Sequence, residues 1–393
     1  MKSEWTYRPL GELVSFASGG TPSKKRDDYW GGTIPWISAK TLKTENIDTS
    51  DLFITEEGLK AGSKIAPKGS ILLLTRGSGL FNGIPIARVE KDVAFNQDIK
   101  CLDSYGEVEN EFIFYWLLSQ KDYLMAKVGV TGIGAGKFDL DFLQKLMIPI
   151  PSERERKSIV GFASSISEKI RCNAKVNDNL YAQVKAIFSE NFLNLDYLPD
   201  GWKTGNLLDI ADYLNGLAMQ KYRPKDGETG LPVLKIKELR QGICDANSEL
   251  CSPSIKSEYI IHDGDIIFSW SGSLLVDIWC GGTCGLNQHL FKVTSNNYDK
   301  WFYYLWTAHH LDRFIAVAAD KATTMGHIKR EELEKAEVII PSKCDYKRIR
   351  TLIKPLFDLI ISNRIENRKL TALRNTLLPK IMSGEIDVAN IQL

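Results

Sequence analysis

The stretch Gly69-Ser-Ile-Leu-Leu-Leu-Thr-Arg-Gly-Ser78 decides the architecture, because it returns 195 residues later as Gly264-Asp-Ile-Ile-Phe-Ser-Trp-Ser-Gly-Ser273. Each copy has the pattern of a short buried strand that ends in a glycine-containing turn. One such match alone is weak evidence of a repeat, and matches in the neighbouring segments at a similar spacing would strengthen it.

The repeat extends on both sides of this stretch. The spacing between matched residues falls steadily from 197 near the N-terminus to 190 further along, as small deletions in the second copy would produce. The chain of 393 residues therefore contains two copies of one unit, each about half of its length. A repeat of this length is too long for a solenoid. The matched pairs include Trp5 and Trp202, Pro35 and Pro232, Asn96 and Asn287, Trp116 and Trp306, and Pro151 and Pro341.

Each copy has two parts. Residues 1–150 and 199–341 combine short apolar strands with Gly-rich turns and a helical segment (Glu111–Ala126 and Lys300–Ala318), which predicts a mixed α/β (α+β) domain. Residues 151–198 form one long predicted helix, and 342–393 form a second long helix with a C-terminal tail. We expect four consecutive parts: two similar mixed domains, each followed by a long helix.

The two predicted helices carry a coiled-coil-like apolar seam. Four of its positions are asparagines, which fix register and partner at a cost in stability when they are buried. We expect the helices to pack on each other as an antiparallel pair with pseudo-twofold symmetry, which would form a rigid spacer of about 60 Å. The alternative is that the asparagines lie at a solvent-exposed edge of the helices. The asparagines are Asn173, Asn177, Asn363 and Asn367, and the apolar seam includes Ile159, Phe162, Ile166, Ile170, Leu180, Ile187, Ile349, Leu352, Leu356, Ile360, Leu370 and Leu377.

Composition places the chain among globular proteins of the cytoplasm. Hydrophobic residues make up 44% and charged residues 25%, no apolar run approaches the ~20 residues of a membrane span, and Met1–Pro9 lacks a signal core. The seven cysteines include no C-x-x-C pair, so we expect no disulfide framework. The net charge of +1 argues against a uniformly basic nucleic-acid binder, so any DNA contact would use local patches.

The usual catalytic and metal motifs are incomplete. The stretch Gly132–Lys137 lacks the first glycine of a P-loop, and Asp98-Ile-Lys100 has no well-placed upstream carboxylate for a nuclease metal site. The spacing Cys280-x3-Cys284-x4-His289 lacks a second zinc half-site, so buried thiols are the favoured interpretation. We expect a chain without a catalytic centre or a metal.

Several sequence blocks follow one another in the same order in both copies. They are Leu10–Phe16 with Gly19–Ser23, Ile34–Leu42 and its partner Leu231–Leu239, Gly69–Gly79 with Gly264–Ser273, Ile148–Ile159, and the closing stretch Leu373 to Ile386. In this order, the blocks resemble the specificity (S) subunit of type I restriction-modification systems. The similarity covers the whole chain, and the closing stretch is its most specific block.

The resemblance implies a function for each part. Each mixed domain would be a target-recognition domain that reads one half of a bipartite, asymmetric site in double-stranded DNA. The helices would set the gap and dock two methyltransferase subunits, through which restriction subunits join. S-adenosylmethionine, magnesium and ATP would belong to those partners, with no cofactor in this chain. The alternative is an assembly scaffold without DNA readout, which the near-neutral charge favours.

Candidate DNA contacts are basic, polar or aromatic residues in loops and turns. Basic side chains at matched positions of both copies favour phosphate or base-edge contact, although solvated surface charge and ordinary turn chemistry explain the same residues. The candidates are Lys24, Lys25, Lys40, Lys43, Arg76, Ser78 and Lys137 in the first copy, and Lys221, Tyr222, Lys237, Arg240, Ser271, Ser273 and His327 in the second.

Overall fold

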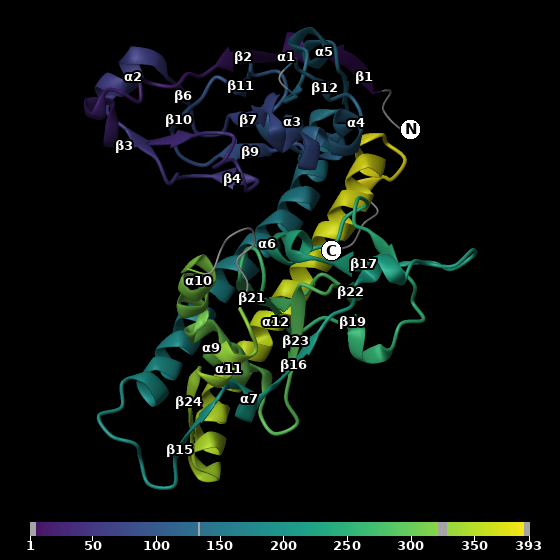
Figure 1. The fold of residues 1–393 in the computed structure, drawn as a ribbon. Coiled ribbons are helices and arrows are strands. Elements are labelled where there is room, and N and C mark those ends of the chain that lie inside the picture. Colours follow the sequence, from purple (N-terminus) through teal and green to yellow (C-terminus); the bar gives the residue numbers. More distant parts are fainter. Residues whose placement is uncertain (1–4, 133, 321–327, 389–393) are drawn as a thin grey trace. The chain divides into compact units, whose positions relative to one another are not determined.

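The computed structural model describes residues 5–132, 134–320 and 328–388, and every statement about the fold concerns these residues. They form two compact units: unit 1 comprises Met1–Glu168 with Thr371–Leu393, and unit 2 comprises Lys169–Leu370. Figure 1 shows the fold and labels many of the helices and strands, and each unit is described by itself. Within the described ranges, no helix is long and apolar enough to cross a membrane.

Unit 1 contains two mixed sheets. The strand predicted at Ile71–Leu74 is buried at all four positions and is the central strand of the larger sheet, as expected for a continuous apolar run. In the larger sheet the order is β2 (Val14–Ser18), β11 (Ile99–Ser104), β7 (Ile71–Leu74), β9 (Ile86–Val89) and β4 (Asn46–Ile47). In the second sheet it is β5 (Phe53–Ile54), β3 (Trp30–Ile37), β10 (Val93–Phe95) and β6 (Lys64–Ala66).

Smaller elements complete unit 1. The helix α3 (Asn110–Ser119) is buried at seven consecutive residues and packs against β9, which explains its continuous apolar sequence. Two small sheets pair β1 (Thr6–Pro9) with β14 (Met147–Ile150), and β12 (Gly129–Val130) with β13 (Gly136–Lys137) and β8 (Arg76–Gly77). The remaining short helices are α1 (Leu10–Leu13), α2 (Glu56–Gly62), α4 (Lys121–Met125) and α5 (Leu140–Gln144).

Unit 2 repeats the strand order of the two larger sheets, with no counterpart of β4 among its described residues. One sheet has the order β16 (Asp212–Asn215), β23 (Leu290–Thr294), β20 (Asp265–Ser269) and β21 (Leu275–Trp279). The other has the order β18 (Leu250–Cys251), β17 (Leu231–Leu234), β22 (Cys284–Leu286) and β19 (Ile260–Ile261), and β15 (Lys203–Asn206) pairs with β24 (Glu337–Ile340). The helices outside the long pair are α7 (Leu207–Ile210), α8 (Ile236–Gln241), α9 (Lys300–His309), α10 (Leu311–Asp320) and α11 (Glu331–Glu334).

In each unit, one parallel strand pair brings two strand ends to the same edge of a sheet. In unit 1, β3 runs parallel to β10, and in unit 2, β17 runs parallel to β22, whereas most other pairs are antiparallel. Carboxyl ends of parallel strands meet at the same edge of a sheet. The segments that follow β3 and β10, and those that follow β17 and β22, therefore lie close together.

The two domain helices predicted as continuous are each broken. The segment 111–126 is split at Gln120 into α3 and α4, and the segment 300–318 is split at His310 into α9 and α10. Neither break coincides with glycine or proline. The Ser119 hydroxyl donates to the Trp116 carbonyl at 2.6 Å, which gives the last turn of α3 an alternative to a regular helical bond.

The long helices are α6 (Glu153–Phe188) and α12 (Lys343–Met382). A capping box starts α6, because the Ser152 amide donates to Glu155 at 3.0 Å and the Glu155 amide to the Ser152 hydroxyl at 3.4 Å. Leu352, predicted in the seam, is 47% exposed, and the adjacent Ile353 is buried instead. The boundary between the units falls inside both helices, so the four-part domain division stays a prediction.

Candidate nucleic-acid interface

The candidate interface of unit 1 centres on Arg76 and Lys137. Strand β8 pairs antiparallel with β13, so that Arg76 lies opposite Lys137 and Gly77 lies opposite Gly136. Both cations are exposed. Within the described residues, neither side chain forms an ion pair or hydrogen bond. Like charges directly opposite each other destabilise a strand pair. The fold therefore keeps two unneutralised cations side by side.

The glycines of this strand pair permit the close approach of the backbones. Gly77 has φ of +136°, and a Cβ on Gly136 would lie 2.9 Å from the Leu80 Cβ and 3.1 Å from the Gly77 carbonyl oxygen. A larger residue at Gly136 would displace β8 or β13, whereas at Gly77 the positive φ is the constraint. The two glycines thus set the backbone positions from which both cations project.

The base of Arg76 is rigid. Its amide donates to the Asp98 carbonyl at 3.2 Å, and the amide and hydroxyl of the buried Thr75 donate to the same oxygen at 2.9 and 3.0 Å. On the other side, the Phe138 amide donates to the Thr75 carbonyl at 2.9 Å. The Asp98 carboxylate accepts from the Asn96 side chain at 3.2 Å, which accounts for one of its oxygens. Only the side chain of Arg76 is left to move.

Further basic candidates lie beside this site. A Cβ on Gly77 would be 4.0 Å from the Ala39 Cβ, so the turn after β3, with exposed Lys40 and Lys43, adjoins β8. Ser38 and Thr41 close this turn, since the Thr41 and Leu42 amides both donate to the Ser38 carbonyl at 3.0 Å. Ser78 is exposed directly after β8. Arg76, Lys137, Lys40 and Lys43, with Ser78, are hereafter the basic turn cluster.

The loop with Lys24 and Lys25 is held against the sheet that contains β3 and β10. The Trp36 indole donates to the Gly20 carbonyl at 3.0 Å, and the Thr21 hydroxyl bonds the Gln97 side chain at 2.7 Å. Lys24 and Lys25 are exposed. The neighbouring Arg26 is bound through two nitrogens to Asp28, at 2.8 and 2.6 Å. The two lysines are therefore the available cations of this loop.

In unit 2, Lys237 and Arg240 occupy the places of Lys40 and Lys43 in the repeat. The turn after β17 is the helix α8, on which Arg240 is exposed and Lys237 lies 3.5 Å from Asp245. Lys221 and Tyr222 are exposed at a short helical turn, Met219–Lys221, and Tyr222 is 40% exposed. Ser273 is exposed as well. These five remain accessible candidates.

The position equivalent to Arg76 is occupied by Ser271, which is 4% exposed. Its hydroxyl hydrogen-bonds His289 Nδ1 at 3.0 Å, and the preceding Trp270 donates from its indole to Asn215 at 3.0 Å. Burial and this hydrogen bond place Ser271 inside the turn, and the DNA contact predicted for it stays a prediction. The predicted contact at His327 lies outside the described residues.

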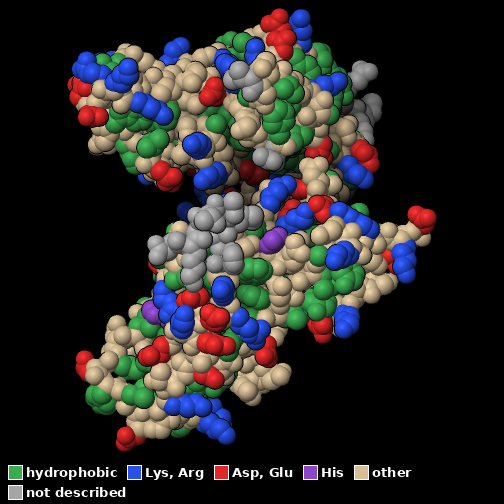
Figure 2. Space-filling model, in the orientation of Figure 1, with side chains coloured by type: hydrophobic (Ala, Val, Ile, Leu, Met, Phe, Trp, Pro, Cys, Tyr) green, Lys and Arg blue, Asp and Glu red, His purple; other side chains and the backbone are tan. Residues whose placement is uncertain are grey.

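On the face drawn in Figure 2, Lys and Arg side chains are interspersed with Asp and Glu over both units. This distribution matches the net charge of +1. Within the described residues, no three His, Cys, Asp or Glu side chains come together as a metal site. The side chains of the Cys280–Cys284–His289 motif differ in surroundings: His289 bonds Ser271, and Cys284 contacts Cys244.

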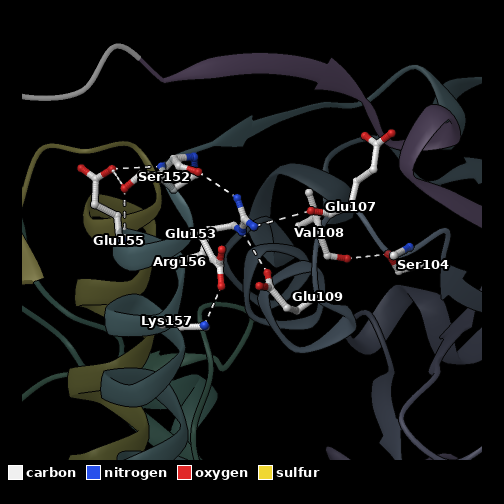
Figure 3. Close-up of polar contacts among 11 residues, drawn as sticks. Ser104, Glu107, Val108, Glu109, Ser152, Glu153, Glu155, Arg156 and Lys157 are labelled. Atoms are coloured by element: carbon white, nitrogen blue, oxygen red, sulfur yellow. Dashed lines mark hydrogen bonds and ion pairs between the residues drawn. The ribbon is translucent and has the colours of Figure 1, made fainter.

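A depression at the start of α6 is lined by Ser152, Glu153, Arg154, Lys157 and Ser158. Figure 3 shows the hydrogen bonds and ion pairs that polar side chains near this depression form. Arg156 donates to Glu109 at 2.9 Å and to the Pro151 carbonyl at 3.0 Å, and Lys157 pairs with Glu153 at 2.5 Å. Of these contacts, the Arg156–Glu109 pair joins α6 to the start of α3, whereas the Lys157–Glu153 pair lies within α6.

Inside unit 2, the four asparagines pair with one another. Asn173 donates to the Asn367 carbonyl oxygen, and Asn363 to that of Asn177, both at 2.9 Å. Asn177 also donates to the Ile360 carbonyl at 3.2 Å, and Asn367 to that of Ile170 at 3.0 Å. Rising numbers on α6 meet falling numbers on α12, so the helices are antiparallel. A pseudo-twofold axis relates the Asn173–Asn367 bond to the Asn363–Asn177 bond, and the Asn177–Ile360 bond to the Asn367–Ile170 bond.

Three arginines of α12 bind carboxylates within their own unit, and sequence patterns gave no sign of them. Each pair uses two guanidinium nitrogens, the geometry that favours arginine over lysine. The pairs are Arg374 with Glu45 at 2.5 and 2.8 Å in unit 1, and Arg364 with Asp277 at 2.8 and 2.8 Å and Arg368 with Asp263 at 2.9 and 2.8 Å in unit 2.

Comparison with known proteins decides the family. The model of the type I restriction modification DNA specificity domain matches the chain twice, over residues 2–182 and 199–373. The chain belongs to this family. The two matches coincide with the two copies of the internal repeat.

The relatives of this specificity-domain chain extend over its length. The MjaIX specificity subunit of Methanocaldococcus jannaschii is 27% identical, over 99% of this chain and 95% of the relative. The EcoKI specificity subunit of Escherichia coli is 23% identical over 97% and 89%. The type I S subunit of M. genitalium has the same fold, with a TM-score of 0.57 at 15% identity over 96% of both chains. The predicted family and fold class are confirmed.

Proposed function

We propose that this chain is the DNA-reading subunit of a type I restriction-modification complex and has no catalytic centre of its own. Each mixed domain reads one half of a bipartite site in double-stranded DNA. The observation that carries this proposal is the difference between matched positions: the same turn has exposed Arg76 in one unit and buried Ser271 in the other. Two domains of one fold with unlike contact residues read unlike half-sites.

The long helices set the gap between the half-sites and dock two methyltransferase subunits, and restriction subunits join through these. The asparagine pairs support this role, because they permit one antiparallel register of the two helices. Recognition of two half-sites about one DNA turn apart requires such fixed spacing. The methyl donor S-adenosylmethionine, magnesium and ATP belong to the partner subunits.

The basic candidates have a local role in this proposal. With a net charge of +1, the whole chain offers little general attraction for DNA. The basic turn cluster and the Lys24–Lys25 loop supply phosphate and base contacts for the first half-site. Lys221, Tyr222, Lys237, Arg240 and Ser273 supply contacts for the second half-site.

The test is to map methylated adenines in DNA from cells that express this chain with its partner methyltransferase. We expect a split motif: two unlike short blocks, a constant gap and one methylated adenine in each block. A complex that assembles without producing such a motif would favour the scaffold alternative.

A separate assay addresses catalysis. The purified chain is incubated alone with magnesium and plasmid DNA, and we expect no cleavage and no methyl transfer from added S-adenosylmethionine. Reproducible cleavage that copurifies with the chain would contradict a non-catalytic role.

A further inference from the structure

We infer that Arg76 reads a guanine in the first half-site and that Lys137, opposite it, binds a neighbouring phosphate. The inference rests on the proposed DNA-reading function and assigns chemistry to one site within it. It starts from the antiparallel pairing of β8 and β13, which places two exposed cations directly opposite each other.

The pairing itself calls for an anionic ligand. Like charges at directly opposed positions destabilise a strand pair, and no described acidic side chain pairs with either cation. The backbone carbonyl of Asp98 binds the Arg76 amide, but the Asp98 carboxylate accepts from the side-chain amide of Asn96. The nearby turn adds Lys40 instead of an acidic residue. A bound phosphate removes the repulsion between the two cations.

The rigid base of Arg76 favours contact with a base edge. The backbone of Thr75 and Arg76 is held by three donors to the Asp98 carbonyl and by the Phe138 amide. A side chain that projects from a fixed backbone loses less entropy when it forms a directed contact. The planar guanidinium presents two parallel donors, which match O6 and N7 of guanine in the major groove.

Lys137 has different chemistry at the same place. Its ammonium group is a flexible point charge, which suits a phosphate and carries little information about sequence. The two cations are held apart by the width of one strand pair. This arrangement lets one side chain reach a base edge while the other neutralises the adjacent backbone.

Unit 2 provides an internal contrast. Its equivalent turn has two corresponding backbone bonds, from the Trp270 amide to the His289 carbonyl at 3.4 Å and from the Ile328 amide to the Trp270 carbonyl at 3.1 Å. The residue in the place of Arg76 is the buried Ser271. An arginine-mediated guanine contact at this turn is therefore a property of the first half-site alone.

The experiment compares Arg76→Ala, Arg76→Lys and Lys137→Gln in the complete complex with its methyltransferase, on a plasmid library with randomised sequence. For both Arg76 variants we expect one G·C position of the first half-site to lose its requirement. Discrimination at that position should fall by about 5- to 150-fold, while the second half-site stays unchanged. For Lys137→Gln we expect the motif to be kept and the log–log salt slope of binding to fall by about one.

The variants distinguish the possible failures. Full retention of the original stringency by Arg76→Lys would show that the planar guanidinium is not required and would overturn the bidentate guanine contact. An unchanged motif in Arg76→Ala would show that Arg76 reads no base and would overturn the inference as well. If Arg76→Ala abolishes methylation altogether, Arg76→Lys and an assay of complex assembly decide between misfolding and lost contact. Failure of the proposed function is different: the unaltered complex would assemble and still give no split motif.

Discussion

At the scale of single residues, the contact between Arg374 and Glu45 is the clearest test of how α12 is held in unit 1. Arg374 is 4% exposed, and it also donates to Ser167 of α6 at 3.0 Å. We expect Arg374→Leu to lower the free energy of unfolding by about 3 kcal/mol, because it leaves Glu45 without its main counter-charge. Urea unfolding measures this. The exposed Glu12, 3.3 Å from Arg8, is the control: Glu12→Gln should change stability by less than about 0.5 kcal/mol. Equal stability of the two variants would contradict this assignment.

The same contact predicts a pH dependence. Burial opposes the charge on Glu45, but the hydrogen bonds from Arg374 and the charge of Lys121 outweigh it and lower the pKa of Glu45. A carboxyl whose pKa is lower in the folded state adds stability above its unfolded pKa, near ~4.3, and loses it as the pH falls through the folded pKa. The stability difference between the chain and Glu45→Gln should be constant between about pH 6 and 8 and should shrink below about pH 4. A difference that grows on acidification would contradict this sign.

Single residues also show the limit of sequence reasoning. Arg76 and Lys137 can each be nominated from the sequence, but their pairing cannot, because it joins strands 60 residues apart whose register depends on the whole domain. Ser271 was nominated by its match to Arg76, and its burial follows from the neighbouring His289, which no spacing rule indicates. Glu45 and Arg374 are separated by 329 positions, so no local pattern marks them.

At the scale of elements, the asparagine pairs predict strong coupling between α6 and α12. Asn173→Ala removes the donor to the Asn367 carbonyl oxygen, and Asn367→Ala removes one of two acceptors of the Asn173 amide, which also donates to Glu366 at 2.6 Å. We expect each variant to destabilise unit 2 by about 1–3 kcal/mol. The double variant should cost less than the sum, with a coupling of about 0.5–3 kcal/mol in a double-mutant cycle. Denaturant unfolding of all four chains measures it. Exposed Asn179 is the matched control on α6, and strictly additive effects at Asn173 and Asn367 would contradict the paired geometry.

The elements that could be predicted are those with long regular patterns. The helix predicted at 151–198 is observed at Glu153–Phe188, and the one predicted at 342–393 is observed at Lys343–Met382. The breaks at Gln120 and His310 were missed, because tertiary packing ends those helices without glycine or proline. α12 also continues through Pro355, where the buried Ile353 and Phe357 offset the proline's local cost.

At the scale of the whole molecule, the proposed function rests on the duplication of one unit and on the differences between its two copies. The two units share the strand order of their two larger sheets, apart from β4 at one edge in unit 1, and each has a parallel pair at an equivalent place. They differ at the turn after β7 and β20, where Arg76 in unit 1 corresponds to Ser271 in unit 2. A fold that is kept while its turn residues change is expected of a scaffold whose specificity resides in loops. The domains should therefore be exchangeable, each with its own half-site.

The most direct test of this central claim is an exchange of residues 1–150 for the first recognition domain of a family member with a different target. The methylated adenines are then mapped in cells that also express the methyltransferase. We predict that one half of the split motif changes to the donor's block, while the other half and the gap length stay as they were. An assembled complex whose motif is unchanged in both halves would contradict the account.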